Sequence, residues 1–292
     1  MKLSVIIVTY NSARDIEACL KSILFNGEYE IIVIDNHSAD ETGRILARFP
    51  DLKLIVNQSN LGYAYANNQG LKLARGEYVL FLNPDTVLKP DTLNIMVEFL
   101  DKNPDVAAAA PRLLNPDGSR QLSIRSFPTF SSVLWEMTGL PRLLPGCKAI
   151  GRWRLRYFDY ESFQYVQQPM ASCLLFRRAV VLKLGGFDET FPIFYNDVDL
   201  SYRLYQQGGK TAYLPQAEVY HKLGSSTAPL KPKMIYENHR SLFRFLKKHN
   251  TGPPFWLKAI ILLPLLSIAA RIRVLNWRLH NRLLRRRASH CA

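Results

Sequence analysis

An α/β fold with a mostly parallel sheet and helices on both faces is predicted, because strand patterns and helical patterns alternate over the first hundred residues. The clearest strand is Tyr78–Leu82, an unbroken apolar run of the kind that is buried on both faces of a parallel sheet. It is expected to end at Pro84, which has no N–H to donate to a neighbouring strand. Asp85 is thereby predicted at the carboxyl edge of a buried strand, where open α/β sheets bind their ligands.

The other elements of the first half follow from local signals. Short runs rich in Ile, Val and Leu predict strands at residues 3–9, 30–35 and 52–56. Ser12 is expected to cap a helix that runs to about residue 25 with an apolar stripe, and Ser38 or Asp40 to cap another that ends near residue 49. Residues 62–74 predict a third helix, and Pro90 opens a fourth that ends near residue 100.

After residue 106 the alternation gives way to a less regular pattern. The turn signal Asn-Pro-Asp-Gly at 115–118 is expected to join two antiparallel strands. Residues 126–165 are aromatic, rich in Arg and irregular, which is typical of a surface excursion or lid. A helix is expected over 197–207, ended by two glycines. Further strands are predicted at 170–176, 211–214 and 218–221.

Charge and cysteine content limit the classes of protein. The chain carries a net charge of +14, yet residues 238–292 contain twelve Lys and Arg and no acidic residue, so subtracting them leaves +2 on residues 1–237. A uniformly basic nucleic-acid binder would not have such a neutral body, although an Arg tail that binds nucleic acid stays an alternative. The four cysteines are scattered, which argues against a zinc ribbon or a disulfide framework and favours a reduced, cytosolic setting. The apolar N-terminus fits a first strand better than a signal peptide.

Three polar groups follow predicted strands, at residues 9–11, 35–36 and 83–85. Each one alone has an ordinary structural explanation as a turn or a helix cap. Together they predict a ligand site, because the carboxyl ends of parallel strands meet at one edge of the sheet. There is no Gly-x-Gly-x-x-Gly after the first strand and no Walker A motif, which disfavours a nicotinamide dehydrogenase. The phosphates of a bound nucleotide would need a metal or side chains to neutralise them.

Here the sequence resembles family 2 glycosyltransferases, which have the GT-A fold and use nucleotide-sugar donors; the closest branch is the rhamnosyltransferase-like group of bacterial polysaccharide assembly. The resemblance extends over about residues 3–221 and rests on ordered motifs: Ser-Val-Ile-Ile-Val-Thr-Tyr-Asn at 4–11, Ile-Asp-Asn-His-Ser-Ala-Asp at 34–40, Asn-Leu-Gly-Tyr-Ala-Tyr-Ala-Asn-Asn at 60–68, Ala-Arg-Gly-Glu-Tyr at 74–78 and Leu-Asn-Pro-Asp at 82–85.

The resemblance implies a donor site. Residues implied to line or support the nucleotide-sugar pocket are Thr9, Tyr10, Asn11, Asp35, Asp40, Asn60, Gly62, Asn67, Asn68 and Asn83. Among them, Asp35 would accept a hydrogen bond from the base. Asp85 would hold a divalent cation, Mg²⁺ or Mn²⁺, for which one carboxylate plus phosphates and waters is an ordinary ligand set. His221 would contact that metal or the diphosphate, and the loop at 224–226 would close over the donor.

The second half resembles the acceptor side of the same family, through Gly-Gly-Phe-Asp-Glu at 185–189 and Phe-Tyr-Asn-Asp-Val-Asp-Leu-Ser-Tyr-Arg at 194–203. The resemblance assigns Asp197 as the general base for inverting transfer; the structural alternative is a helix cap. Relatives commonly have Glu where this chain has Asn196. Asp199 is about 200° round the helix from Asp197, so both carboxylates are not expected to face one site.

The C-terminal tail is apolar over residues 255–270, about 24 Å as a helix and shorter than the roughly 30 Å core of a bilayer. Residues 272, 275, 279 and 283 then share one helical face beside arginines at 271, 278, 282 and 285. This pattern predicts an interfacial helix on anionic lipid. A core helix with a solvated basic end and a spanning helix remain alternatives.

The predicted organisation is a GT-A domain at 1–248, with a donor half at 1–110 and an acceptor half at 111–248, followed by a membrane-associated helical tail at 249–292. The expected function is metal-dependent inverting transfer from dTDP-rhamnose or a UDP-sugar to a glycan or lipid-diphosphate-linked acceptor, at the cytoplasmic face of the membrane. The alternative is a non-catalytic nucleotide-sugar or polysaccharide-binding relative, which Asn83 and Asn196 suggest.

Overall fold

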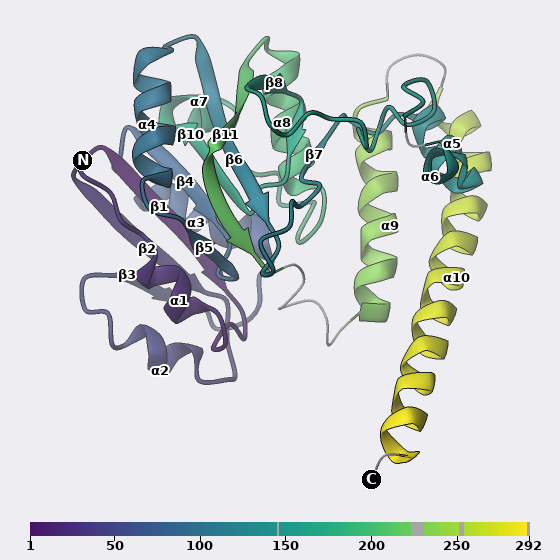
Figure 1. Ribbon diagram of the computed structural model, residues 1–292, viewed down its shortest axis with the longest axis horizontal. Coiled ribbons are helices and arrows are strands. Elements are labelled where there is room, and N and C mark those ends of the chain that lie inside the picture. Colours follow the sequence, from purple (N-terminus) through teal and green to yellow (C-terminus); the bar gives the residue numbers. More distant parts are fainter. Residues whose placement is uncertain (145, 223–230, 251–253, 291–292) are drawn as a thin grey trace.

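The computed structural model describes residues 1–144, 146–222, 231–250 and 254–290 (Figure 1). Within these residues, nine strands form one mixed sheet in the order β3-β2-β1-β4-β10-β6-β11-β5, with β8 paired to β11. The strands are β1 (Leu3–Thr9), β2 (Tyr29–Asp35), β3 (Lys53–Val56), β4 (Tyr78–Leu82), β5 (Thr86–Leu88), β6 (Val106–Leu114), β8 (Gln164–Val166), β10 (Cys173–Arg177) and β11 (Lys210–His221).

The first four main strands are parallel, as the alternating sequence predicted. β1 pairs in parallel with β2 on one side and β4 on the other, and β2 pairs with β3. Thr9 lies opposite Asp35 in this register, and Ile7 lies opposite Leu82. The ends of β1, β2 and β4 therefore reach one edge of the sheet, where their polar successors gather.

Helices cover both faces because side chains of a strand alternate between its two faces. Val5 and Ile7 of β1 pack with α1 (Ile16–Lys21), α2 (Thr42–Leu46) and α4 (Thr92–Lys102). Ile6 and Val8 point the other way and pack with α3 (Tyr63–Leu73), α7 (Arg178–Lys183) and α8 (Asn196–Gln206). The predicted α/β architecture with a mostly parallel central sheet is confirmed.

Several boundaries differ from the prediction. The helix expected from Ser12 is shorter, since α1 begins at Ile16 and the Ser12 hydroxyl accepts the N–H of Tyr10 instead of capping it. The two strands expected at 211–214 and 218–221 are one strand, β11, with an irregularity between Leu214 and Glu218. Pro215 lies in that interval and has no N–H to donate, which gives the physical reason for the interruption.

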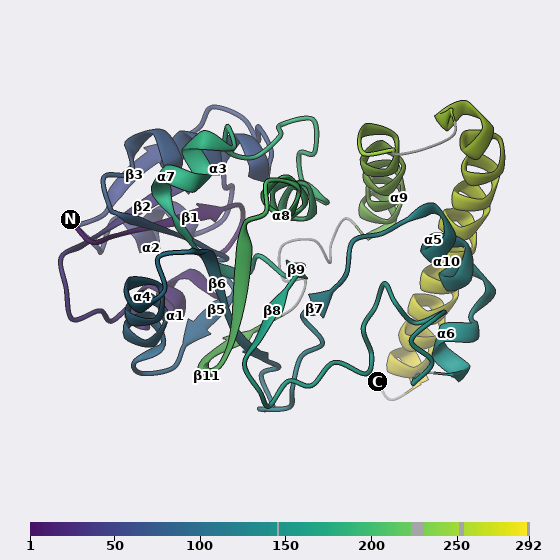
Figure 2. The same ribbon diagram turned by 90° about the horizontal axis from the view of Figure 1, so that it is seen from above.

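The excursion at 126–165 is more ordered than its composition suggested. It holds α5 (Phe130–Thr138), which starts at a capping box of Thr129 and Ser132, and the short α6 (Leu140–Leu143). β7 (Ile124–Arg125) and β9 (Gln168–Pro169) bracket it as a separate two-stranded antiparallel sheet. The turn at 115–118 is present, but the antiparallel strand pair expected around it is not: Leu114 and Arg120 form an isolated bridge, and the next strand, β7, pairs with β9. Figure 2 shows β7 and β9 between the large sheet and the C-terminal helices.

Two long helices end the chain: α9 (Lys231–Lys248) and α10 (Phe255–His290) (Figure 1). They pack against each other, and both views place α5 beside α10. The apolar stretch and the amphipathic stretch of the tail belong to one continuous helix, which Pro264 does not break. Phe255–Leu279 is long and apolar enough to cross a membrane by length and composition, at about 37 Å.

Little of this apolar segment is covered by protein, since 17% of its most apolar stretch is buried. A core helix would be mostly buried, so the core-helix interpretation is wrong. The exposed apolar side chains include Trp256, Ile260, Leu263, Ile268 and Ile272. Arg282, Leu283 and Arg285, which were predicted to belong to the lipid-binding face of the tail, have side chains outside the described ones.

A buried carboxylate connects α8 to α9. Asp199 has no exposed surface, and it accepts hydrogen bonds from Arg203 Nε at 2.7 Å, Lys248 Nζ at 2.6 Å and His249 Nε2 at 2.8 Å. Burial by itself would raise the pKa of Asp199, but the hydrogen bonds from His249 and Lys248 and the charge of Arg203 lower it to about 2. Asp199 therefore faces away from Asp197, as the helical periodicity predicted.

We expect Asp199→Asn to lower the free energy of unfolding by about 3 kcal/mol at neutral pH, because it leaves buried cations without their carboxylate. Since the pKa of Asp199 is depressed in the folded state, its contribution is complete above the ordinary Asp value of about 4 and is lost as the pH falls toward 2. Urea titrations in detergent at pH 7 and pH 3 measure this difference. Asp105→Asn, which breaks the exposed pair with Lys210, is the control and should change little. An equal loss at both pH values would contradict the electrostatic explanation.

Candidate active site

A cavity of about 1160 Å³ opens at the carboxyl edge of the sheet. It is lined by six of the residues that the sequence singled out, which come from segments far apart in the chain: Tyr10, Asn60, Asn83, Asp85, Asp197 and His221. The cavity continues past them to α9 and α10. The tertiary structure thus brings together the candidate metal ligands and the candidate base.

The loops after β1 and β2 bind each other. The Asp35 carboxylate accepts hydrogen bonds from Thr9 Oγ1 at 2.8 Å and from the Ser38 hydroxyl at 2.5 Å. Asn11, which has a φ of 52°, donates its N–H to Ser38 Oγ and accepts the N–H of Ala39. These side chains do not line the cavity; they fix the shape of the loop on which Tyr10 reaches it.

Asp40 and the start of α2 complete this support. Its carboxylate accepts the N–H groups of Ala13 and Thr42 and the Thr42 hydroxyl. Burial would raise the pKa of Asp40, but the Thr42 hydroxyl and these N–H donors lower it. The predicted supporting role of Asp40 therefore corresponds to contacts within the loop.

The segment before α3 forms another part of the wall. Asn60 Oδ1 accepts hydrogen bonds from Asn36 Nδ2 at 2.9 Å and from the Gly62 N–H at 3.0 Å. Gly62 has a φ of 90°, and a Cβ there would lie 3.0 Å from Pro192. Only glycine suits this left-handed position beside the segment that leads into α8.

Two asparagines of α3 lie behind the cavity wall. Asn67 is buried and donates from Nδ2 to the Tyr63 carbonyl, while its Oδ1 has no partner among the described residues. Asn68 Nδ2 donates to the Phe187 carbonyl and to Glu189 Oε1, and its Oδ1 accepts the Phe187 N–H. Asn68 therefore attaches α3 to the segment before α8, which connects the two halves of the domain.

Asp85 and His221 form a pair suited to a divalent cation. Asp85 Oδ1 is buried without a hydrogen-bond partner and lies 3.5 Å from His221 Nε2. On its other side, the His221 ring places Nδ1 2.7 Å from Gln121 Oε1. Gln121 Nε2 already donates to Asn115 Oδ1, so Oε1 is free to accept, and this contact favours the tautomer that carries its proton on Nδ1. Nε2 is then a lone-pair donor aimed at Asp85, with Gln121 as the outer partner that orients the ring.

This pair fits a metal that takes its remaining ligands from substrate and water. In the described part of the chain, no group of three or more His, Cys, Asp or Glu side chains could enclose a cation by itself. Asn83 is occupied elsewhere, because its Oδ1 accepts the Tyr63 hydroxyl at 3.0 Å and its N–H donates to the Ser172 carbonyl. The Asn at position 83 thus serves the packing between β4, α3 and β10.

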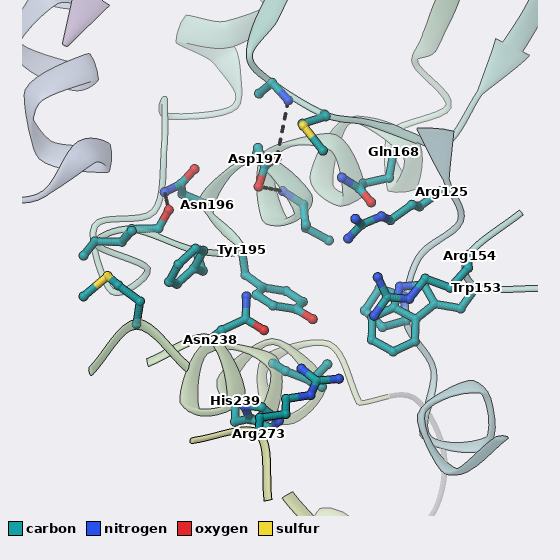
Figure 3. Close-up of a pocket in the computed structure, with 18 of the residues that line it drawn as sticks. Arg125, Trp153, Arg154, Gln168, Tyr195, Asn196, Asp197, Asn238, His239 and Arg273 are labelled. Atoms are coloured by element: carbon teal, nitrogen blue, oxygen red, sulfur yellow. Dashed lines mark hydrogen bonds between the residues drawn. The ribbon is translucent and has the colours of Figure 1, made fainter. Parts of the chain in front are cut away.

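Asp197 lies in the first turn of α8 and faces the cavity (Figure 3). Its Oδ1 accepts the Val198 N–H at 2.9 Å, and its Oδ2 lies 3.5 Å from the Ala171 N–H. Burial raises the pKa of this carboxyl, while the Val198 and Ala171 N–H groups and the charge of Arg125 act to lower it. The helix-cap alternative does not describe it, since Tyr195 occupies the cap position.

The contacts of Asn196 give a physical reason for an amide at this position, where the family resemblance gives Glu. Its side chain is buried, and Nδ2 donates to the carbonyls of Phe191 and Ile193 at 3.3 and 2.9 Å. A carboxylate could not donate to either carbonyl. The amide therefore shapes the segment that enters α8.

Four further residues of the cavity were not predicted from the sequence: Arg125, Trp153, Arg154 and Arg273 (Figure 3). The Arg154 guanidinium stacks 4.8 Å from the Trp153 ring centroid and lies 3.4 Å from Glu136 Oε2. No signal singled out Arg125 or Arg273, and for Trp153 and Arg154 the only signal was the richness of residues 126–165 in Arg and aromatic residues. It did not indicate which arginines would point inward.

Comparison with known proteins agrees with this geometry. Residues 4–180 match the model of Glycosyl transferase family 2, which is more than half of the chain. An N-acetylglucosaminyl-diphospho-decaprenol L-rhamnosyltransferase of Mycobacterium tuberculosis is 30% identical over 275 residues, covering 88% of this chain and 87% of that one.

Solved structures share the fold. The mannosyltransferase PcManGT from Pyrobaculum calidifontis, in complex with GDP-Man and Mn²⁺, aligns with a TM-score of 0.59 at 20% identity, covering 92% of this chain and 69% of that one. TarS 1–349 of S. aureus, in complex with UDP-GlcNAc, aligns with a TM-score of 0.55 at 22% identity, covering 91% and 72%. The architecture is thus the GT-A fold, and with the family match over residues 4–180 this chain belongs to glycosyl transferase family 2.

Proposed function

We propose that this protein is an inverting glycosyltransferase that moves a sugar from a nucleotide-diphosphate donor to a hydroxyl of a lipid-linked saccharide. The observation that carries the proposal is that Asp197 and the Asp85–His221 pair line one cavity at the carboxyl edge of the sheet. The name of the mycobacterial relative supports a lipid-diphosphate acceptor and a rhamnosyl donor. The donor proposed is dTDP-rhamnose, and a UDP-sugar is the alternative.

The donor would occupy the edge formed by the β1, β2 and β4 loops. Tyr10, Asn60 and Asn83 line the cavity there. Thr9, Asn11, Asp35 and Asp40 would act through the loop that they stabilise, and Gly62, Asn67 and Asn68 through the α3 wall. Asp85 and His221 would hold Mg²⁺ or Mn²⁺, which supplies positive charge for the departing diphosphate.

Asp197 would remove the proton of the acceptor hydroxyl. The hydroxyl oxygen then bonds to the anomeric carbon while the bond from that carbon to the phosphate oxygen breaks, so the nucleoside diphosphate leaves with its electron pair. The proton remains on Asp197. Burial raises the pKa of this carboxyl above that of an ordinary Asp, which makes it a stronger base for the transfer.

We expect Asp197→Asn to reduce sugar transfer by about 10³-fold, while binding of the nucleotide sugar survives, because the amide cannot accept the proton. For the wild type, kcat/KM should fall as the pH decreases through a pKa above the ordinary Asp value. Sugar transfer to a short-chain lipid-linked saccharide is measured as a rate, and binding of the nucleotide sugar is measured by calorimetry. Asp159→Asn, at an exposed turn, is the control. Full activity in Asp197→Asn would refute the base assignment. Donor binding by the wild type without transfer or hydrolysis would instead identify a non-catalytic binding relative.

We expect Asp85→Ala to abolish the Mn²⁺-dependent part of donor binding, because it removes the carboxylate that faces His221. A thermal-shift screen of dTDP-rhamnose and UDP-sugars with and without Mn²⁺ measures this dependence and identifies the preferred base. Asp117→Asn, at an exposed turn, is the matched control. An undiminished effect of Mn²⁺ in Asp85→Ala would place the metal elsewhere.

The organisation proposed is a catalytic domain at 1–248, with a donor half at 1–110 and an acceptor half at 111–248, and a membrane-associated tail at 249–292. The exposed apolar side chains of α10 support its contact with the membrane. In the acceptor half, α9 contacts α8, the helix that carries the proposed base, through the hydrogen bond from Lys248 to Asp199. The cytoplasmic face is proposed because the scattered cysteines favour a reduced setting.

We expect the paired substitution Ile260→Asp and Leu263→Asp to release the protein from lipid vesicles, because both side chains are exposed and would carry charge into the bilayer. Flotation with phosphatidylglycerol vesicles measures the bound fraction. The control is Leu54→Asp together with Val56→Asp, which are exposed apolar positions on β3. Equal flotation of both pairs would exclude α10 as the membrane contact.

A further inference from the structure

A cationic region lies in the cavity beyond Asp197. Arg125, on β7, lines the cavity, and its guanidinium has no hydrogen-bond or ion-pair partner among the described residues. Burial, and then the nearby charge of Arg154, lower the pKa of Arg125. A partly buried, unpaired guanidinium is costly unless a ligand supplies the missing negative charge.

A second arginine of this region is held in place by its neighbours. Arg154 stacks on Trp153, and its buried Nε is ion-paired with Glu136 Oε2 at 3.4 Å, although the geometry is not that of a hydrogen bond. Glu136 Oε1 is buried without a hydrogen-bond partner. Figure 3 shows Arg125 and Arg154 directed into the same space, with Arg273 of α10 on another side. Arg125 and Arg154 thus share this part of the cavity with the carboxylates Glu136 and Asp197, and of the two arginines only Arg154 is ion-paired with one of them.

The wall next to these arginines is apolar. It is formed by side chains of α5, α9 and α10, namely Met137, Leu242, Leu265, Leu266, Ile268 and Ile272. Ile268 and Ile272 are also among the exposed residues of the apolar segment of α10. The cavity therefore joins the polar edge of the sheet to a helix with the length and composition of a membrane segment.

We infer that Arg125 and Arg154 bind the diphosphate of a polyprenyl-diphosphate-linked acceptor, with the first prenyl units against the apolar wall of α9 and α10. This inference rests on the proposed function and assigns the acceptor subsite within it. Guanidinium groups bind phosphate oxygens through paired hydrogen bonds, and apolar side chains accept a prenyl chain. A sugar carried on that diphosphate then lies between the arginines and Asp197, with its hydroxyl at the base.

The diphosphate of the nucleotide donor is the other possible source of this chemistry. Asp85 and His221 already provide a metal site for it at the sheet edge, on elements that carry neither arginine. An apolar wall has no use in binding a nucleotide sugar, whereas it matches a prenyl chain. The acceptor is therefore the ligand that accounts for both the charge and the wall.

The test measures binding to the full chain in detergent, with three probes: farnesyl diphosphate and inorganic diphosphate, both in EDTA, and UDP or dTDP with Mn²⁺. The wild type should bind farnesyl diphosphate more tightly than inorganic diphosphate. Arg125→Gln and Arg154→Gln should each lower the affinity for farnesyl diphosphate by about tenfold or more and leave the affinity for the nucleotide unchanged. Arg125→Lys should retain part of the affinity, and Arg44→Gln, an exposed arginine on α2, is the matched control.

Unchanged farnesyl diphosphate binding in Arg125→Gln and Arg154→Gln would overturn the inference, as would equal affinity of the wild type for farnesyl and inorganic diphosphate. A parallel loss of nucleotide binding would assign the arginines to the donor instead. These outcomes leave the proposed function intact if sugar transfer persists. Failure of the wild type to bind any nucleotide with Mn²⁺ would refute the proposed function itself.

Discussion

The antiparallel insertion of β10 between β4 and β6 is the constraint on which the site depends. Cys173 lies opposite Leu82 in this register, so the residues just before β10 reach the same edge as the end of β4. There the Ser172 carbonyl accepts the Asn83 N–H, and the Ala171 N–H faces Asp197. One strand thus attaches the second half of the domain to the parallel sheet, and the proposed base lines the same cavity as the proposed metal ligands.

The first turn of α8 shows how environment separates two identical carboxyl groups. Asp197 is buried, its hydrogen-bond donors are backbone N–H groups, and its pKa rises although the charge of Arg125 acts to lower it. Asp199 is also buried, but three cationic or hydrogen-bonding side chains hold its pKa near 2. The same helix therefore presents a group that can accept a proton on one face and a permanent anion that anchors α9 on the other. The contacts of Asp199 hold α9 in place, and α9 forms part of the cavity wall.

The cavity changes character along its length because its walls come from different layers. Loops after parallel strands supply polar side chains at the sheet edge, where the family's nucleotide-sugar donors are expected. β7 supplies Arg125, the excursion between β7 and β9 supplies Trp153 and Arg154, and the two C-terminal helices supply apolar side chains. A substrate with a polar sugar, a charged linker and an apolar chain matches this order of surfaces. Packing α10 against α9 places the exposed apolar helix where such a chain would leave the protein.

Much of the fold and part of the site could be predicted from the sequence alone. Strands such as Tyr78–Leu82 appear in the predicted place because burial on both faces requires an unbroken apolar run, and Pro84 ends pairing wherever it occurs. Asp85, Asp197 and His221 could be singled out because their motifs are local. The helix before residue 25 was predicted too long, since tertiary contacts decide where a marginal helix frays.

By itself, the sequence determined the α/β architecture, the ordered family motifs and the helical, apolar character of the tail, because these depend on contacts between neighbours in the chain. Only the tertiary structure decided that Arg125 and Arg154 line the same cavity as Asp197, that Asn83 accepts the Tyr63 hydroxyl, and that α10 lines the cavity. Those facts depend on packing between residues that are far apart in the sequence. No local pattern encodes such contacts, since side-chain direction in an irregular segment is set by what it packs against.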